Sequence, residues 1–250
     1  MKKSLVSKLI LLSTASFLLT GCVLYYGNTF DIDTYGIPRF VRNDFTQLGK
    51  ITKISRFRSA AGHDYSDDFE SCRNMKHYYA PYDKYRVNNE IEIYSPVDGV
   101  IHSIIKEGHG ASKGLINQQV RIQSSEYPAF VFVLFHIDLI SLDISKGKKL
   151  QAGELIGHAR MYYPDINDYG GSFDIAVWVN TPSGIRNISY FDTMADTLFS
   201  NYIARGAKSR DDFIISKEAR DADPLTCDGQ RFTSNGKLEN WFTLNMTLLH

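Results

Sequence analysis

Short strand-like segments separated by turn residues are the feature that most limits what this chain can fold into. In the last of them, apolar residues occupy every second position from Phe173 to Val179, so they share one face of a strand. Asp98-Gly99, a pair typical of hairpin turns, lies between two others. The segments lie at residues 90–94, 100–105, 119–123, 129–135 and 171–179. This spacing predicts a mainly β fold, either an antiparallel sandwich or a partly closed barrel.

The C-terminal part of the chain has a different pattern. Apolar residues recur there at helical spacing, and Gly206 is well placed to end a helix. These residues are Phe191, Met194, Ala195, Leu198, Phe199 and Tyr202. We therefore expect a β domain at 55–185, followed at 186–250 by a C-terminal helix and an irregular tail packed on that domain. His77 is expected in a surface loop rather than in a histidine cluster.

The N-terminus has the pattern of a bacterial export signal. Three lysines precede or flank an apolar run at residues 9–19, which is too short to span a bilayer as a helix. The run ends in Leu19-Thr20-Gly21-Cys22, which resembles the lipobox of bacterial lipoproteins. That resemblance implies a signal peptide at 1–21, a lipid on Cys22 and a tether at 22–54. An ordinary signal peptide with an incidental cysteine is the alternative.

The lipobox resemblance also implies a location. A lipid on Cys22 would anchor the protein in the bacterial cell envelope. Val23 stands where inner-membrane lipoproteins often carry an aspartate, which favours the outer membrane and a domain facing the periplasm. The chain has 28 basic and 28 acidic residues, so long-range attraction to nucleic acid is not expected.

Two further cysteines, Cys72 and Cys227, remain after Cys22 is assigned to the lipid. An oxidising envelope compartment favours a disulfide between them. Two separately buried thiols are the alternative, because sequence alone does not show that the residues meet. We expect the disulfide, which would pin the C-terminal tail to the β domain.

Four segments of the chain, taken together and in their order, resemble a known family. They are the glycine-bounded stretch at 146–157 and the strand-like stretches at 94–101, 134–139 and 170–177. Together they resemble the LytM or lysostaphin-like zinc peptidases, which cleave peptidoglycan peptides. The resemblance implies a LytM-like β fold of the duplicated hybrid motif type over about residues 56–180. It also implies a function at the bacterial cell wall.

The family holds zinc with two histidines and one aspartate and leaves a fourth position for water. Its first two ligands are four residues apart in a His-x-x-x-Asp pattern. Two registers are compatible with this chain. One matches Asp64 and puts Ala60 where the first histidine belongs, whereas the other pairs His63 with Asp67. Both registers stay open at this stage.

The third ligand departs from the family pattern. Ser172 replaces the first histidine of a His-x-His pair, and Asp174 replaces the second, metal-binding one. The resemblance therefore implies His63, Asp67 and Asp174 as candidate zinc ligands, with His136 as the surviving catalytic histidine. We expect a degenerate LytM-like lipoprotein that binds peptidoglycan or a partner cell-wall hydrolase. An active zinc metallopeptidase with an atypical ligand set is the alternative.

Each candidate residue also has an ordinary structural interpretation. His63 would then hydrogen-bond within a turn, and Asp67 would cap a helix or lie in a solvated loop. His136 would be a buried histidine with satisfied nitrogens. Asp174 lies on a strand between two apolar residues, so if it is buried it needs either a metal or a paired histidine.

Overall fold

The computed structural model describes residues 29–107, 115–163, 168–169 and 171–246 of the 250-residue chain. Cys22 and the expected signal peptide lie outside the described residues, so the lipid anchor stays a prediction. No helix within the described ranges is both long enough and apolar enough to cross a membrane.

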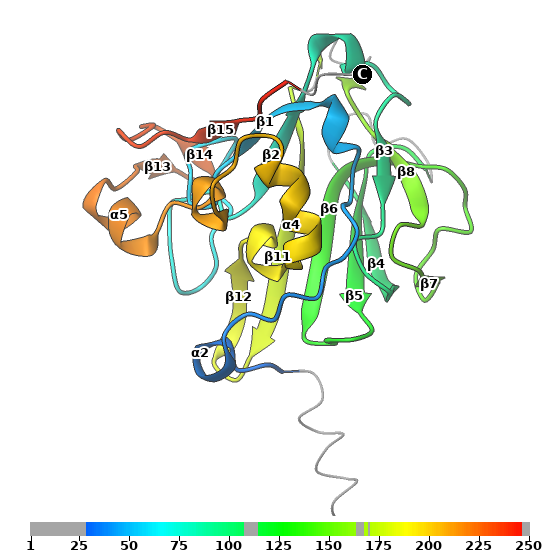
Figure 1. Cartoon of the computed structure of the whole chain (residues 1–250), viewed down its shortest axis with the longest axis horizontal. Coiled ribbons are helices and arrows are strands. Elements are labelled where there is room, and N and C mark those ends of the chain that lie inside the picture. Colours follow the sequence, from blue (N-terminus) through cyan, green and yellow to red (C-terminus); the bar gives the residue numbers. More distant parts are fainter. Residues whose placement is uncertain (1–28, 108–114, 164–167, 170, 247–250) are drawn as a thin grey trace, which may run out of the picture.

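Strands dominate the structure and are labelled in Figure 1. They are β1 (Ile51–Ser55), β2 (His77–Pro81), β3 (Glu92–Tyr94), β4 (Gly99–Lys106), β5 (Gln118–Ser124), β6 (Phe130–Leu139), β7 (Lys149–Leu150), β8 (Leu155–Ala159), β9 (Tyr162–Tyr163), β10 (Asp168–Tyr169), β11 (Phe173–Thr181), β12 (Gly184–Ile188), β13 (Cys227–Asp228), β14 (Arg231–Phe232) and β15 (Trp241–Thr243).

The helices are short. They are the α-helices α2 (Ile32–Tyr35), α3 (Tyr190–Thr193), α4 (Asp196–Ile203) and α5 (Lys217–Ala222), and the 3-10 helices η1 (Leu48–Lys50), η2 (Asp83–Tyr85) and η3 (Arg210–Phe213).

One large antiparallel sheet organises these elements. Its strand order is β15-β1-β2-β11-β6-β5-β4-β7, with β12 added on β11, and β8 joining β3 to β6. Among the described residues the end strands β15 and β7 do not pair with each other, so the sheet is not a closed barrel. The mainly β, antiparallel fold expected from the strand patterns is confirmed.

The main core lies on one face of this sheet. Every second residue of β11 from Phe173 to Val179 belongs to it, as the alternation predicted. Burying each such side chain stabilises the fold by about 1.5–3 kcal/mol relative to leaving it in water. Helix α4 covers this face (Figure 1). The hydroxyl of Tyr202 in this helix lies 3.4 Å from that of Tyr79 on β2.

The helix expected from the C-terminal apolar stripe is present but divided. Met194 and Ala195 are extended rather than helical, with ψ of 134° and 150°, and they separate α3 from α4. Val41 hydrogen-bonds to the backbone on both sides of this break: its N–H donates to Thr193 O, and its C=O accepts from Ala195 N. Gly206 follows α4 with φ of 98°, as expected of a residue that ends a helix.

Residues 29–54 differ from the tether that the sequence suggested. Phe40, Val41 and Phe45 are buried in the main core, and β1 pairs with both β2 and β15. These residues pack without a regular period, so their contribution to the core leaves no periodic pattern in the sequence. The described part of the segment is therefore integral to the β domain.

Two local expectations also need correction. The turn at Ser95–Gly99 connects β3 to β4, but these strands do not pair as a hairpin: β3 pairs with β8, and β4 pairs with β5 and β7. His77 is buried on β2, where Nδ1 contacts Ser55 O and Nε2 contacts Ser189 Oγ. Burial lowers the pKa of His77 to about 4.

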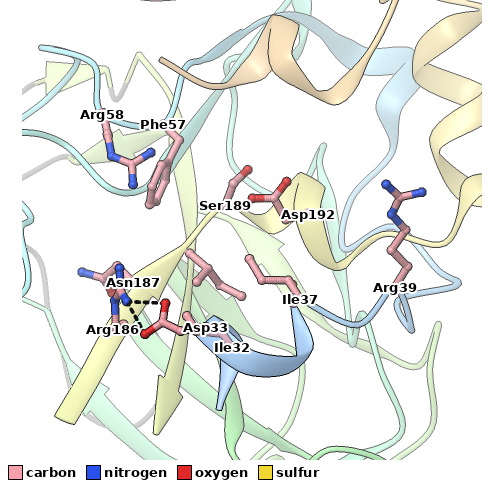
Figure 2. Close-up of a pocket in the computed structure, with 12 residues that line it drawn as sticks. Ile32, Asp33, Ile37, Arg39, Phe57, Arg58, Arg186, Asn187, Ser189 and Asp192 are labelled. Atoms are coloured by element: carbon pink, nitrogen blue, oxygen red, sulfur yellow. Dashed lines mark hydrogen bonds and ion pairs between the residues drawn. The ribbon is translucent and has the colours of Figure 1, made fainter. Parts of the chain in front are cut away.

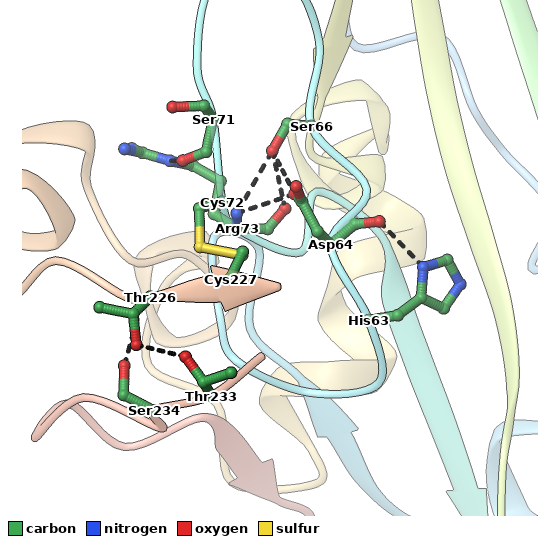
Figure 3. Close-up of a disulfide and its surroundings, with 10 residues drawn as sticks. All are labelled: His63, Asp64, Ser66, Ser71, Cys72, Arg73, Thr226, Cys227, Thr233 and Ser234. Atoms are coloured by element: carbon green, nitrogen blue, oxygen red, sulfur yellow. Dashed lines mark hydrogen bonds between the residues drawn. A yellow bond between two sulfur atoms is a disulfide. The ribbon is translucent and has the colours of Figure 1, made fainter. Parts of the chain in front are cut away.

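The segment at 56–74, which we call the 56–74 loop, is fixed to the rest of the molecule by covalent and ionic contacts. The predicted Cys72–Cys227 disulfide is confirmed, with the two Cα atoms 5.8 Å apart, and it joins the loop to the β13–β14 hairpin (Figure 3). Buried Glu70 lies between the guanidinium groups of Arg58 and Arg73, each at 2.7 Å. The loop is thereby held in one position beside the sheet.

Candidate functional site

Strand β11 directs one acidic side chain away from the main core. Asp174 follows core residue Phe173 and therefore points to the opposite face, which we call the outer face. Its side chain is 0% exposed, because the 56–74 loop and neighbouring strands cover it. A buried carboxylate costs several kcal/mol without compensating partners, so its contacts define the site.

The main partner of Asp174 is a buried lysine. Lys76 Nζ lies 2.6 Å from Asp174 Oδ2, and the lysine side chain is only 2% exposed. The rings of Phe135, Tyr65 and Tyr78 surround this ammonium group, with centroids 4.2, 4.8 and 4.9 Å away. The three rings favour the cation through their negative faces and exclude water from the ion pair.

His63 holds the other side of the lysine ammonium. Its Nδ1 lies 2.9 Å from Asp64 O and its Nε2 lies 3.2 Å from Lys76 Nζ. A carbonyl only accepts, so Nδ1 carries the proton and Nε2 accepts from the ammonium. Burial and the charge of Lys76 both lower the pKa of His63, which keeps the ring neutral and able to accept.

Gly62 allows His63 to reach the site. It adopts a φ of +70°, and a Cβ built at this position would lie 2.3 Å from the ring of Tyr78. The backbone of the 56–74 loop thus approaches β2 more closely than a residue with a side chain would allow.

A β-bulge brings His136 to the outer face. The pairing of β5 with β6 shifts between the pairs Gln118–Ile137 and Val120–Leu134, so one residue of β6 is extra. Leu134 and Ile137 both face the main core, whereas His136 adopts a φ of +59° and is 31% exposed. A non-glycine residue in this backbone region is strained, and such strain gathers at functional sites.

Polar groups on both sides orient the ring of His136. Nδ1 lies 3.1 Å from Glu107 Oε2 and 3.2 Å from Asn117 Oδ1, while Nε2 lies 3.6 Å from Asp174 Oδ1. The backbone N–H of His136 also donates to Glu107 Oε2 at 2.8 Å. Burial raises the pKa of Glu107, and the nearby imidazole opposes that rise.

These residues do not fit a zinc ion. Zinc needs ligand atoms at about 2.0–2.3 Å, but the Lys76 ammonium already lies between His63 Nε2 and Asp174 Oδ2. A divalent cation beside that ammonium would also face strong like-charge repulsion. Within the described ranges, no group of three His, Cys, Asp or Glu residues is arranged to hold a metal.

The aspartates of the two candidate registers make structural contacts. Asp67 Oδ1 accepts from the N–H groups of Phe69 and Glu70, and Oδ2 accepts from Asn187 N at 2.8 Å on β12. Asp64 Oδ1 accepts from Arg73 N and from the Ser66 hydroxyl (Figure 3). The structure thus brings His63, His136 and Asp174 together, while the contacts of Asp67 tie the 56–74 loop to the sheet edge.

Sequence reasoning missed Lys76, Glu107 and Asn117. Lys76 stands just before β2 and two residues before Tyr78, which is opposite Asp174 in the sheet, but that pairing was not predicted. Glu107 and Asn117 lie just beyond the ends of β4 and β5, which form a hairpin-like pair. Because β4 and β5 pair, the residue after β4 and the residue before β5 must lie at the same edge of the sheet. Polar residues at these two positions are therefore a signal that the sequence does contain.

An aromatic and polar surface continues from this site along the outer face. Trp178 Nε1 donates to the Tyr65 hydroxyl at 3.0 Å, and the Arg121 guanidinium lies 4.4 Å from the Trp178 ring centre. Gln119 Oε1 accepts from Arg121 Nε at 2.8 Å. All four side chains are half-buried, so part of each remains accessible to a ligand.

Comparisons with known proteins give distant structural matches, two of which are described below. No protein-family profile matches the chain, and a search of curated proteins finds no significant match. The structure of Csd3 from Helicobacter pylori matches over 58% of this chain and 34% of Csd3, with 16% identity and a TM-score of 0.35. A chain of the SpoIIQ–SpoIIIAH pore-forming complex matches over 69% of this chain and 98% of its own length, with 12% identity and a TM-score of 0.35.

The chain therefore spans about a third of the length of Csd3. Both matches are below the similarity that places a chain in a family. The function of this protein is therefore inferred from its own residues.

Proposed function

We propose that this protein is a non-catalytic cell-envelope protein whose outer face binds peptidoglycan or a partner cell-wall hydrolase. The observation that carries this proposal is the position of the Lys76 ammonium, 2.6 Å from Asp174 and 3.2 Å from His63. Among the described residues, a buried lysine of the chain itself supplies positive charge directly to Asp174. A lysine ammonium donates hydrogen bonds but does not bind and activate a water as a metal does.

The proposed contact surface starts at His136 and extends over Trp178. An indole face and a guanidinium group offer stacking and hydrogen-bond donation, which are the interactions that sugars and peptides accept. Gln119 adds an amide beside them. The fixed 56–74 loop supports this surface, because the hydroxyl of Tyr65 in the loop accepts a hydrogen bond from the Trp178 indole and holds that ring in place.

The lipid on Cys22 belongs to the same proposal. It would hold the domain next to the cell wall, so that a modest affinity suffices for binding. A Cys22→Ser variant should leave the membrane fraction and appear in the soluble fraction. Retention in the membrane fraction would contradict the anchor.

The binding proposal is tested with purified peptidoglycan sacculi. We expect the protein to co-sediment with sacculi equally well with and without a chelator and to release no soluble peptides from them. Trp178→Ala should weaken co-sedimentation. Trp241→Ala is the matched control, since Trp241 lies on β15 and its ring contacts the ammonium group of Lys53 on β1 instead. Chelator-sensitive release of peptides would support the zinc metallopeptidase and contradict the proposal.

A second arm separates the two partners. If sacculi fail to retain the protein, purified cell-wall hydrolases are presented to it, and Trp178→Ala should weaken the capture of one of them. Absence of binding to sacculi and hydrolases alike would overturn the proposal.

A further inference from the structure

A polar cavity lies away from the site at Asp174, on the side of the molecule where α2 meets β12 and α3. Its volume is about 460 Å³, which is within the range of small-molecule sites. Figure 2 shows that Asp192, from the first turn of α3, lies beside Ser189 near the middle of the lining. The lining also includes the apolar residues Ile37, Phe57 and Ile188.

The positive charges around this cavity all have partners. Arg39 pairs with Asp196 at 3.0 Å. Arg186 pairs with Asp33 at 3.1 Å, as Figure 2 shows. Arg58 is held by Glu70 at 2.7 Å. Each of these three guanidinium groups therefore already has a carboxylate.

The Asp192 carboxylate differs from these acids. Among the described residues, no hydrogen bond or ion pair reaches its oxygens. Arg210 lies nearby, but its nitrogens donate to Phe191 O, Met194 O and Asp196. The cavity thus carries one negative charge without a direct counter-ion, next to apolar side chains.

We propose that this cavity binds a small organic cation, a primary ammonium group on an apolar stem the length of a lysine side chain, with Asp192 as its counter-ion. The ammonium would donate to the free carboxylate oxygens, and the stem would contact Ile37 and Phe57. A larger anion would be repelled by Asp192 and would meet guanidinium groups that already hold carboxylates. This inference is independent of the function proposed for the outer face.

The pH dependence follows from the groups that face Asp192. Burial raises its pKa to about 6, although Arg210, Arg58 and Arg39 lower it and Asp211 adds to the rise. The carboxylate is charged above that pH, and a primary amine stays charged up to about pH 10. Binding should therefore be constant near neutral pH and weaken about tenfold per pH unit below 6.

The test is a ligand-observed NMR titration of the intact protein with Nα-acetyl-lysinamide. Nα-acetyl-norleucinamide has a similar stem without the charge, and we expect it to bind at least about tenfold more weakly, since the charge-assisted hydrogen bond is lost. Asp192→Asn should weaken the lysine derivative to the level of the norleucine derivative. Asp143→Asn is the control, since it removes an exposed acid of another loop, and should bind like wild type.

Cadaverine is titrated in parallel, and the tighter of the two amines identifies a peptide-borne or a free amine as the ligand. Equal binding by the Asp192→Asn variant and wild type would overturn the proposal, as would equal binding of the lysine and norleucine derivatives. Failure of both amines to bind would overturn it too. A urea unfolding curve for Asp192→Asn confirms that the variant is folded, so that lost binding reports the counter-ion.

Discussion

Asp174 and Asp192 are two carboxylates that differ in whether the protein provides a direct partner for their charge. Asp174 is completely buried, but Lys76 lies 2.6 Å away, so the chain supplies its own cation. Asp192 lines a cavity and has no direct partner among the described residues. Lys76 compensates the charge of Asp174, so no cation is needed there. The charge of Asp192 has no such direct partner among the described residues, which is why we propose a cation for its cavity.

The largest expected effect comes from breaking the Asp174 pair. Lys76→Met should destabilise the protein by about 3–5 kcal/mol, because it leaves a buried carboxylate without its counter-ion. Lys76→Met combined with Asp174→Asn should recover most of that loss, since the uncompensated charge is gone. Urea unfolding of the four members of this cycle measures both values. Wild-type stability in Lys76→Met alone would show that the pair contributes nothing.

The disulfide holds the loop that covers Asp174. Replacing Cys72 and Cys227 together by serine should cost on the order of 2–4 kcal/mol, because the bridge constrains a separation of 155 residues in the unfolded chain. The loop carries His63 and Tyr65, so their signals should broaden in NMR spectra of the variant. The contacts around Asp192 should change less. Equal broadening around both aspartates would remove this distinction between the two sites.

Asp192→Asn, unlike the preceding substitutions, should stabilise the protein. The folded-state pKa of Asp192 is raised to about 6 from an unfolded value near 3.8, so ionisation disfavours the folded state. The variant should match wild type below pH 4, gain stability between pH 4 and 6, and keep a gain of about 1–2 kcal/mol at pH 7. Thermal unfolding across this pH range measures it. A loss of stability at pH 7 would mean that Asp192 has a stabilising partner.

The smallest effect concerns the bulge that presents His136 to Asp174. His136→Gly should be more stable than His136→Ala by about 1 kcal/mol, because glycine adopts the φ of +59° without strain. Both variants lose the same imidazole contacts, so the difference isolates the backbone. Urea unfolding of the pair is the measurement. Equal stability would indicate that the backbone relaxes out of this conformation when the imidazole is removed.

Much of the fold was predictable because a strand with one buried face leaves a period of two in its sequence. The alternation from Phe173 to Val179 located β11 and its core face correctly. The confirmed disulfide followed from counting cysteines in an oxidising compartment. Residues 29–54 were missed as part of the domain, since an irregular segment that packs through scattered residues such as Phe40 has no period to detect.

The candidate site was less predictable because it depends on pairing between distant strands. The sequence singled out His63, His136 and Asp174, and the structure brings all three together. The sequence offered no reason to select Lys76. The approach of Lys76 to Asp174 depends on the β2–β11 register and on the position of the 56–74 loop. The bulge at His136 was hidden as well, since the apolar run that leads to it has no break in composition.

Metal content tests the central claim, that Lys76 provides the cation at Asp174, most directly. The protein is purified without chelator, dialysed against zinc and analysed by elemental mass spectrometry together with Asp174→Ala. We predict no stoichiometric zinc in either protein, because the ammonium occupies the space between His63 and Asp174. About one equivalent of zinc in the wild type, lost in Asp174→Ala, would contradict the claim.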